Sequence, residues 1–511
     1  MRCGAKLYSS ESVQRMSTPS LYDVVVCGGG VVGAAAMASL QQLRARLLSE
    51  NTLTPHAAER QALAGRLSRL LLADPMARPQ YNAESKMHNL RTVSLTPVSS
   101  RLLDNLGCWK QLQTRHAYYR IALRHEHTNS PEIQRPQDGT KTFMSSLMGG
   151  GCSTAEPLLE FMNINSPLGF ISYNAEINTR LLDAIEERKV QDAALTRDNG
   201  ETGEVCDRVE FGSALDSYVL PPESTIDGPP GTAVMRGPSG EEALEFSLLL
   251  GCDGRGSQLR NQVGTYSVSH DYRQTVYVCT VQLEPVVDGN VCCFQNFFSN
   301  GDIVAMLPTS PDTANIVFST TAAHARKLAA STQVELVKEL NNRLHAFAAR
   351  DIPQIISVPE EDVCGQVVRA QGMFPSRLQV VVNNSVPRCL LMGDAAHSIH
   401  PFAGQGMNLG LYDVCTMIKV LEKAIRNGQD IGSFLGVGRP FLSEVAVHSG
   451  SIIAALEAIY GLVTNAPKLS CFGMSALQNV PLLSSLGKQS IIHVASGGLL
   501  ERRHKECFLL Q

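Results

Sequence analysis

The stretch CLLMGDAAHSIHPFAGQGMNLGLY at residues 389–412 decides the fold. It begins with an apolar run that predicts a buried strand, and this strand ends at Gly393-Asp394. Asp394, at the carboxyl end of the strand, is placed to accept a hydrogen bond from a sugar hydroxyl. The residues from Gly404 to Asn408 lead into a helix, and their bare backbone amides suit an electron-rich ring edge. The alternative interpretation is a strand-turn-helix whose glycines only let two backbones touch.

A second glycine turn lies near the start of the chain, where YDVVVC at 22–27 is followed by GGGVVG at 28–33 and a small-residue helix. In this arrangement Gly28 makes the tight turn and Gly30 lets a pyrophosphate reach the backbone. Gly33 lets helix and strand pack closely, and the amino end of the helix holds the phosphates. The first folded segment is therefore predicted to bind a dinucleotide.

Such a site expects an acid at the end of its second strand, about 20 residues further on, to bind a ribose hydroxyl. Glu50 stands at nearly that spacing, whereas Asp74 ends the better apolar run, LLLA at 70–73. We favour Asp74, because residues 41–69 have the pattern of a helical, charged insertion. The other acid is interpreted as a solvated side chain.

A third glycine-containing turn holds Asp253, which follows the strand predicted at 246–250. An acid in this position suits a phosphate or ribose contact, although an ordinary Asp-Gly turn explains the same residues. Arg91 leads into the amphipathic helix predicted at 97–106, and its pattern is equally that of a surface arginine.

Composition places the chain among globular enzymes. Of its 511 residues 44% are hydrophobic and 18% charged, and the formal net charge is −4 without any long basic block, so nucleic acid is not an expected partner. The 14 cysteines lack zinc-ligand spacing, which predicts neither a metal site nor a disulfide framework. No uninterrupted apolar run has the length that a membrane-spanning helix needs.

The remaining segments predict a second, different unit. Short alternating strands between 266 and 319 predict an antiparallel sheet, and the tail after Pro440 is predicted to be helical and amphipathic. Residues 128–165 and 191–242 are interpreted as long excursions rich in turn residues. Residues 1–20 carry three basic residues and one acid, which fits a mitochondrial transit segment or an unstructured tail.

Three glycine-containing turns in this order resemble the flavoprotein aromatic hydroxylases, the para-hydroxybenzoate hydroxylase superfamily. GDAAHSIHPFAGQGMNLGLYD, RTVSLTP and FQNFFSNGDIVAMLP resemble its ubiquinone-biosynthesis members, and the tail AIYGLVTNAP with SALQNVPLL is similar to the mitochondrial ones. One departure is Phe294 to Phe297, FQNF, where the family has a Trp-Gln-Arg-Phe-like run. That departure concerns the substrate side and not the flavin.

The resemblance implies bound FAD and a set of residues around it. The ADP half would meet the first glycine turn and Asp74, Arg91 and Asp253 would lie at the ribityl-pyrophosphate side, and the remaining residues would meet the ribityl chain and the isoalloxazine. The expected cofactor-binding residues are Gly28, Gly30, Gly33, Asp74, Arg91, Asp253, Gly393, Asp394, Pro401, Gly404, Gln405, Gly406, Met407 and Asn408. No side chain is assigned as a catalytic acid or base, because in this family the flavin carries the chemistry. His397 is interpreted as satisfying a local hydrogen bond.

The implied activity is an FAD-dependent monooxygenase that hydroxylates a polyprenylated hydroxybenzoate, at C5, with dioxygen in ubiquinone biosynthesis. Implied partners are ferredoxin and ferredoxin reductase as electron donors and a multiprotein biosynthetic complex. The implied location is the matrix side of the mitochondrial inner membrane, with peripheral membrane contact. Two alternatives stay open, a flavin hydroxylase or epoxidase of another lipid and a non-redox Rossmann-type prenyl carrier.

The expected fold is α/β, with a discontinuous Rossmann-like FAD-binding domain, an inserted antiparallel-sheet substrate domain and a helical C-terminal tail. The expected domain boundaries place 21–115, 166–264 and 366–435 in the FAD-binding domain, 116–165 and 265–365 in the substrate domain, and 436–511 in the C-terminal helical region.

Overall fold

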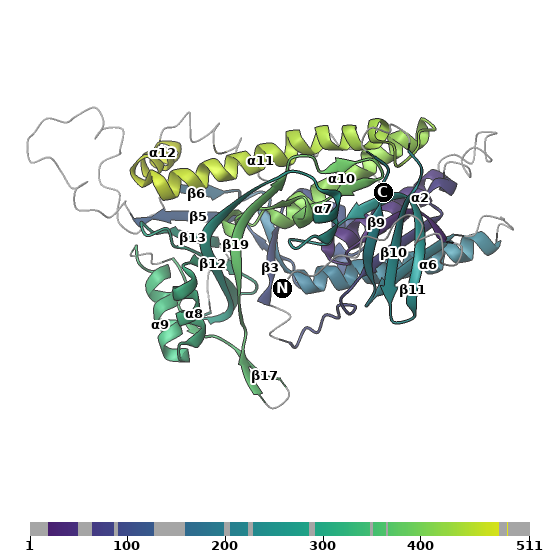
Figure 1. The fold of residues 1–511 in the computed structure, drawn as a ribbon. Coiled ribbons are helices and arrows are strands. Elements are labelled where there is room, and N and C mark those ends of the chain that lie inside the picture. Colours follow the sequence, from purple (N-terminus) through teal and green to yellow (C-terminus); the bar gives the residue numbers. More distant parts are fainter. Residues whose placement is uncertain are drawn as a thin grey trace, which may run out of the picture.

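The computed structural model describes residues 19–49, 64–85, 90–126, 159–198, 205–222, 228–285, 292–347, 351–363, 366–479 and 488. Two large sheets carry most of this part of the chain, and helices cover them (Figure 1). Glu50 and all but the last two residues of the predicted transit segment or tail lie outside the described residues.

The first sheet has eight strands in the order β20-β21-β11-β1-β2-β8, with β10 pairing β11 and β9 pairing β10. Its parallel part consists of β21, β11, β1, β2 and β8, as the dinucleotide-binding pattern predicts. Alternate residues of β1 enter two different cores, because Val24 and Val26 face one side of the sheet and Val25 faces the other. The strands are β1 (Ser20–Cys27), β2 (Arg69–Asp74), β8 (Cys206–Phe211), β9 (Ala214–Val219), β10 (Gly231–Gly237), β11 (Gly240–Gly251), β20 (Ser385–Val386) and β21 (Cys389–Leu391).

The interpretation of residues 191–242 as an excursion is wrong for the residues that the structure describes there. β8 extends the parallel sheet beside β2, β10 is the antiparallel partner of β11, and β9 is the antiparallel partner of β10. β8 and β9 are mostly half-buried, and β8 is rich in charged residues, so these two strands lack the apolar run by which a buried strand is recognised.

Helices cover one face of this sheet. Residues 174–188 carry apolar side chains at helical spacing and form part of α6, where Ile177, Leu181, Leu182 and Ile185 are buried. The buried Arg44 ties α2 to this region, with its guanidinium 2.5 Å from Asp192 and 2.7 Å from Asp207. The helices are α2 (Val31–Ser49), α4 (Pro97–Asn105), α6 (Asn174–Asp198) and α10 (Gly406–Arg426).

The second sheet has nine strands in the order β22-β19-β12-β15-β14-β13-β5-β6, with β16 pairing β12. The predicted antiparallel pairing is confirmed for β12, β13, β14 and β15, whereas β5 joins β13 in parallel. Helices α8 (Ala322–Ala330) and α9 (Gln333–Leu344) pack on one face. The strands are β5 (Arg120–His125), β6 (Leu159–Met162), β12 (Ser267–Leu283), β13 (Cys292–Phe297), β14 (Ile303–Pro308), β15 (Thr313–Thr320), β16 (Ile355–Ser357), β19 (Gln371–Val381) and β22 (His397–Ser398).

Two small sheets complete the described strands. β3 (Thr92–Leu95) and β4 (His116–Tyr118) flank β7 (Gly169–Tyr173), and β17 (Glu360–Val363) pairs with β18 (Gln366–Arg369). In Figure 1 the β17 ribbon extends away from the two large sheets.

The helical tail is confirmed. The π-helical turn at Phe434–Gly438 continues into α11 (Arg439–Asn465), and α12 (Pro467–Asn479) follows. In Figure 1 α11 runs along the top of the molecule, from the first sheet toward the second. The stretch Phe434–Asn465 meets a length-and-composition criterion for a membrane span, and 28% of its most apolar window is buried. Its buried side chains, Phe441 and Ile452 among them, pack into the core that contains α10.

Candidate functional site

Three predicted turns meet at one edge of the eight-stranded sheet. The register pairs Cys27 of β1 with Gly251 of β11, and Gly251 with Leu391 of β21. The turns that hold Gly30, Asp253 and Asp394 therefore leave adjacent strands at their carboxyl ends. This edge of a parallel sheet is where doubly wound folds bind ligands.

The glycines of the first turn have two different roles. Gly28 has φ +110°, and a Cβ there would lie 2.4 Å from the Cys252 carbonyl oxygen. A Cβ on Gly33 would lie 1.9 Å from the Gly28 carbonyl oxygen, so this glycine permits the close packing of helix on strand. A Cβ on Gly30 would meet nothing within 4 Å. Packing therefore explains Gly28 and Gly33, whereas the space beside Gly30 is open for a ligand.

Asp74 ends β2, as predicted, and holds the glycine turn. One carboxylate oxygen accepts a hydrogen bond from the Gly29 amide at 2.6 Å, and the other accepts one from the Met76 amide at 2.7 Å. This acid therefore orients the backbone next to Gly30.

Asp253 has one carboxylate oxygen without a partner. Its Oδ2 accepts the amides of Gln258 and Leu259, at 2.8 and 3.2 Å, where α7 (Gln258–Val263) begins. Its Oδ1 is buried and has no hydrogen bond within the described residues. An ionised oxygen in this state lacks a donor, and a ligand hydroxyl supplies one.

Gly393 and Asp394 form the turn after β21, and a buried pair that the sequence analysis missed holds this turn. Gly393 has φ +59°, and its amide donates to Asp413 Oδ2 at 2.9 Å. The same oxygen lies 2.7 Å from His397 Nε2, which confirms the predicted local hydrogen bond of His397. Burial acts to lower the pKa of His397, but the Asp413 carboxylate outweighs it and the pKa is raised. An acid within the apolar run LGLYDVC of α10 was the available signal for Asp413.

The start of α10 presents free backbone amides. Pro401–Ala403 form one 3₁₀ turn, Gly404 adopts φ +62°, and the first α-helical hydrogen bond of α10 runs from Leu409 to Gln405. The preceding amides, those of Gly406, Met407 and Asn408, therefore have no backbone acceptor within the helix. A Cβ on Gly406 would meet nothing within 4 Å. This helix terminus suits an electron-rich ligand.

The Asn408 side chain has a structural role in addition to its amide. Its Oδ1 accepts the Thr96 amide at 3.0 Å and the Ser99 hydroxyl at 2.7 Å, and its Nδ2 donates to the Ser94 carbonyl at 2.8 Å. The start of α10 is thereby fixed to the β3–α4 connection.

The hydrogen bonds described for Arg91 are separate from those of the three turns. Arg91 precedes β3 with an exposed side chain, and its carbonyl accepts the Asn174 amide at 2.9 Å. No hydrogen bond among the described residues joins its guanidinium to the three turns.

An apolar cluster lies beside the loop that precedes α10. Phe402 and Tyr460 pack there against side chains of the nine-stranded sheet, and Met474 joins them from α12. The cluster consists of Phe297, Ile303 and Val463 with Leu123, Phe402, Tyr460 and Met474. Gln295 of β13 also donates to the Phe402 carbonyl at 3.0 Å, so the second sheet contacts the loop directly.

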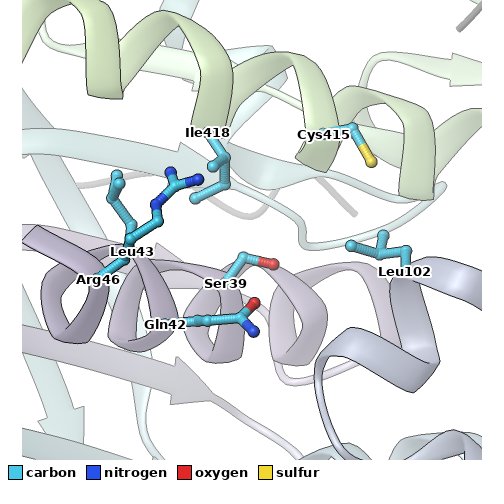
Figure 2. A pocket seen from close by; sticks show the side chains of 7 residues that line it. All are labelled: Ser39, Gln42, Leu43, Arg46, Leu102, Cys415 and Ile418. Carbon is cyan, nitrogen blue, oxygen red and sulfur yellow. The ribbon is translucent and has the colours of Figure 1, made fainter. Parts of the chain in front are cut away.

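A small cavity lies elsewhere, between α2, α4 and α10 (Figure 2). It has room for little more than a water molecule. The Ser39 hydroxyl on its wall is buried and unpartnered within the described residues, which suits a bound water. This cavity is too small for the ligand that the sheet edge suits.

Comparison with known proteins agrees with the geometry. Residues 224–431 match a family described as FAD binding domain. The mitochondrial ubiquinone biosynthesis monooxygenase COQ6 of Rattus norvegicus is 27% identical over 524 residues, which cover 96% of this chain and 94% of the relative. The Homo sapiens protein of the same name is 27% identical over 534 residues, covering 97% and 98%.

Solved structures share the fold. p-Nitrophenol 4-monooxygenase PnpA from Pseudomonas putida DLL-E4 aligns with a TM-score of 0.58 and 13% identity, over 94% of this chain and 99% of its own. Aklavinone-11 hydroxylase, in a ternary complex with FAD and aklavinone, aligns with a TM-score of 0.54 and 16% identity, over 89% of this chain and 71% of its own.

The α/β fold with its helical tail and the matching FAD domain lead to one conclusion. The chain is an FAD-dependent monooxygenase, and the ubiquinone biosynthesis monooxygenases resemble it along almost its whole length.

Proposed function

We propose that this enzyme hydroxylates the aromatic ring of a polyprenylated hydroxybenzoate, at C5, in ubiquinone biosynthesis. The observation that carries the proposal is the convergence of Gly30, Asp253 and Asp394 at one sheet edge. That edge occurs in a chain similar over almost its whole length to ubiquinone biosynthesis monooxygenases.

The residues at the edge fit FAD in three respects. The open backbone at Gly30 and the amino end of α2 would hold the pyrophosphate. The unpartnered Oδ1 of Asp253 would accept a hydroxyl, and Asp394 would meet the ribityl chain. Asp74 and Arg91 would complete the adenosine and pyrophosphate side, and Gly28, Gly33 and Gly393 would shape the backbone around it.

The start of α10 would meet the isoalloxazine. The amides of Gly406, Met407 and Asn408 would donate to its electron-rich edge, and Pro401, Gly404 and Gln405 would shape the approach. Bound FAD, once reduced, would supply the activation of dioxygen from which one oxygen atom enters the substrate ring.

The described side chains would orient the substrate and exclude water. Phe402 and Phe297 belong to the apolar cluster that lies between the loop and the nine-stranded sheet. Such a wall suits a phenol that carries a polyprenyl chain, because burying apolar surface contributes about 25 cal/mol per Å². The cluster also keeps the reacting atoms in a dry environment.

Electrons are proposed to come from ferredoxin and ferredoxin reductase, and dioxygen is the second substrate. The proposed location is the mitochondrion, on the matrix side of the inner membrane, within a multiprotein biosynthetic complex. The curated relatives' names give them as mitochondrial, and this supports the location.

Peripheral membrane contact is proposed for one face of α11 and α12. Ile459 and Leu462 of α11 are 46% and 44% exposed, and Leu469 and Phe472 of α12 are 59% and 39% exposed. Other side chains of α11 pack into the core, so the helix lies along the fold. An amphipathic helix in this position suits binding in the plane of a bilayer surface.

The test is a reconstituted reaction. The purified chain is loaded with FAD, supplied with ferredoxin and its reductase, and given a short-chain polyprenyl hydroxybenzoate under ¹⁸O₂. The expected product carries one ¹⁸O at C5, as mass spectrometry and NMR would establish. A product hydroxylated at another carbon, or cofactor turnover without product, contradicts the proposed substrate. Absence of flavin absorbance after loading favours a carrier.

A further inference from the structure

Both ring nitrogens of His400 form hydrogen bonds. The Phe402 amide donates to Nδ1 at 3.1 Å, and Nε2 lies 2.8 Å from Gln274 Oε1. Because Nδ1 accepts a hydrogen bond, the proton of the neutral ring is on Nε2, which donates to Gln274. The imidazole therefore joins the loop before α10 to strand β12.

Its surroundings keep this imidazole neutral. Rings of Tyr272, Tyr460 and Phe402 lie 4.9, 4.9 and 5.5 Å from it, centre to centre. His400 is 1% exposed, and burial lowers its pKa to about 3. A charged imidazolium would also lose the Nδ1 acceptor that the Phe402 amide uses.

The contacts form a continuous chain from the second sheet to the loop. Gln274 Nε2 donates to the Gly301 carbonyl at 2.7 Å, which fixes the amide that His400 contacts. Gln295 Nε2 donates to the Phe402 carbonyl at 3.0 Å. The amide and the carbonyl of Phe402 are thus both held by side chains, one of them from the nine-stranded sheet.

We propose that His400 is a positioning residue for residues 401–404, the loop that would face the isoalloxazine. His400 fixes Phe402 and, through Gln274, ties this loop to the nine-stranded sheet. The proposal rests on the function proposed above, because it takes the isoalloxazine to lie against this loop. Its consequence is that the sheet carrying the substrate wall and the loop facing the cofactor keep a fixed relation.

Three variants separate the parts of this role. His400→Phe retains an aromatic ring and loses both hydrogen bonds. His400→Asn keeps an acceptor that reaches the amide two residues on, as Asn does in turns, but is too short for Gln274. Gln274→Met leaves His400 intact and removes its partner. His345→Phe is the matched control, because the ring nitrogens of His345 also lie close to two partners, the backbone carbonyls of Asn341 and Ile352, at the end of α9.

Hydrogen exchange of the FAD-free chain tests the contact itself. In His400→Phe, the peptide containing Phe402 is expected to exchange about tenfold faster, whereas His400→Asn restores most of its protection and His345→Phe leaves it unchanged. Equal exchange of this peptide in wild type and His400→Phe overturns the proposal.

FAD titration tests the consequence for the cofactor. His400→Phe is expected to weaken FAD binding about tenfold and to shift the visible spectrum and midpoint potential of the bound flavin. His400→Asn and Gln274→Met are each expected to weaken FAD binding about threefold. His345→Phe should match wild type in all three readouts. If His400→Phe also matches wild type, the positioning role is overturned. If wild type itself takes up no FAD, the proposed function fails, while the exchange result still decides the contact.

Discussion

Asp253 has a carboxylate that is only partly satisfied by the described residues. Its Oδ2 serves the start of α7, and its Oδ1 is buried without a partner in the described residues. A buried ionised oxygen is costly unless it is paired, so this oxygen indicates a missing donor. Ligand binding would complete its hydrogen bonding.

Asp253→Asn tests this point. Asn keeps an oxygen for the α7 amides but places an NH₂ group where a ligand hydroxyl would donate, so FAD affinity is expected to fall by about 10-fold to 100-fold. Flavin fluorescence titration measures the affinity. The free energy of unfolding, measured with urea, should change by less than about 1 kcal/mol. Asp312→Asn, an exposed acid with two side-chain donors, is the control. Unchanged affinity in Asp253→Asn would remove this acid from the site.

His400 gives the protein a defined response to acid. Its pKa is lowered to about 3 in the fold, while the unfolded value is about 6.5, so the unfolded chain binds the extra proton first. Stability is therefore lost as pH falls below about 6.5, at up to about 1.4 kcal/mol per pH unit for this one group.

The difference in free energy of unfolding between wild type and His400→Phe isolates the contribution of His400, because the other ionisable groups titrate in both proteins. Urea unfolding at about pH 6.5 and pH 4.5 is expected to show the wild type losing roughly 2 kcal/mol more than the variant. Parallel losses in the two proteins would mean that the imidazole is not buried in its neutral form.

Local patterns predicted some site residues and not others. Gly28 and Gly33 could be predicted because the turn and the packing are encoded within one strand-turn-helix segment, and Asp74 because it ends an apolar run. Gln295 was missed, since its partner Phe402 is 107 residues away and no periodicity reports such a contact. The Arg91 assignment stays a prediction, because it rests on resemblance alone.

Among the elements, α10 connects the free amides at its own start with the turn after β21. Its amino end offers free amides, and Asp413, further along, accepts hydrogen bonds from Gly393 and His397. The Ser449 hydroxyl of α11 donates to the other oxygen of Asp413 at 3.4 Å. One carboxylate thus joins the β21 turn, β22 and the C-terminal helix.

Asp413→Asn is expected to destabilise the fold by about 3 kcal/mol, because it leaves a buried histidine without its counter-ion. The raised pKa of His397 in wild type gives stability that is fully present below about pH 6.5 and is lost as pH rises through the folded value. In the variant burial alone acts, so that protein instead loses stability on acidification. The difference in free energy of unfolding between wild type and Asp413→Asn, measured with urea, should therefore decrease from pH 5 to pH 8. An increase contradicts the ion pair.

The exposed face of α11 makes a separate prediction. Ile459→Ser with Leu462→Ser removes two half-exposed apolar side chains without adding charge. Binding to sedimenting liposomes is expected to weaken about thirtyfold, because each of the two side chains contributes about 1 kcal/mol when buried. Val334→Ser, at a 77% exposed position on α9, is the control. If the double variant and the control sediment alike, this face does not dock.

Elements with strong patterns were predictable, and weakly apolar ones were not. The α6 helix and strands β12, β14 and β15 follow from periodicity of apolar residues. Strand β9 was missed because its half-buried sequence differs little from a loop, and β10 because its short buried run lies between two glycines. Pairing reveals them as strands, because β10 pairs with β11, itself 12 residues long, and β9 pairs with β10.

At the scale of the whole molecule, we propose the division into an FAD-binding domain at 21–115, 166–264 and 366–435, a substrate domain at 116–165 and 265–365, and a helical region at 436–511. The pairing of β1, β2, β8, β11 and β21 supports the first of these. Strand β19 lies within the third FAD-binding segment yet pairs with β12 in the nine-stranded sheet. This one chain segment thus joins the two sheets next to the loop that His400 holds.

The central claim is that FAD lies against Gly30 at the edge of the eight-stranded sheet. Gly30→Val tests it most directly, because a Cβ there meets no atom of the described residues within 4 Å and the added side chain would obstruct a ligand. In an equilibrium FAD titration followed by flavin fluorescence, wild type and the control Gly65→Val, also in open space, should bind alike. Gly30→Val should keep its thermal unfolding midpoint and lose at least about 100-fold in affinity, as steric exclusion of a pyrophosphate requires. Wild-type affinity in a folded Gly30→Val protein would contradict the account.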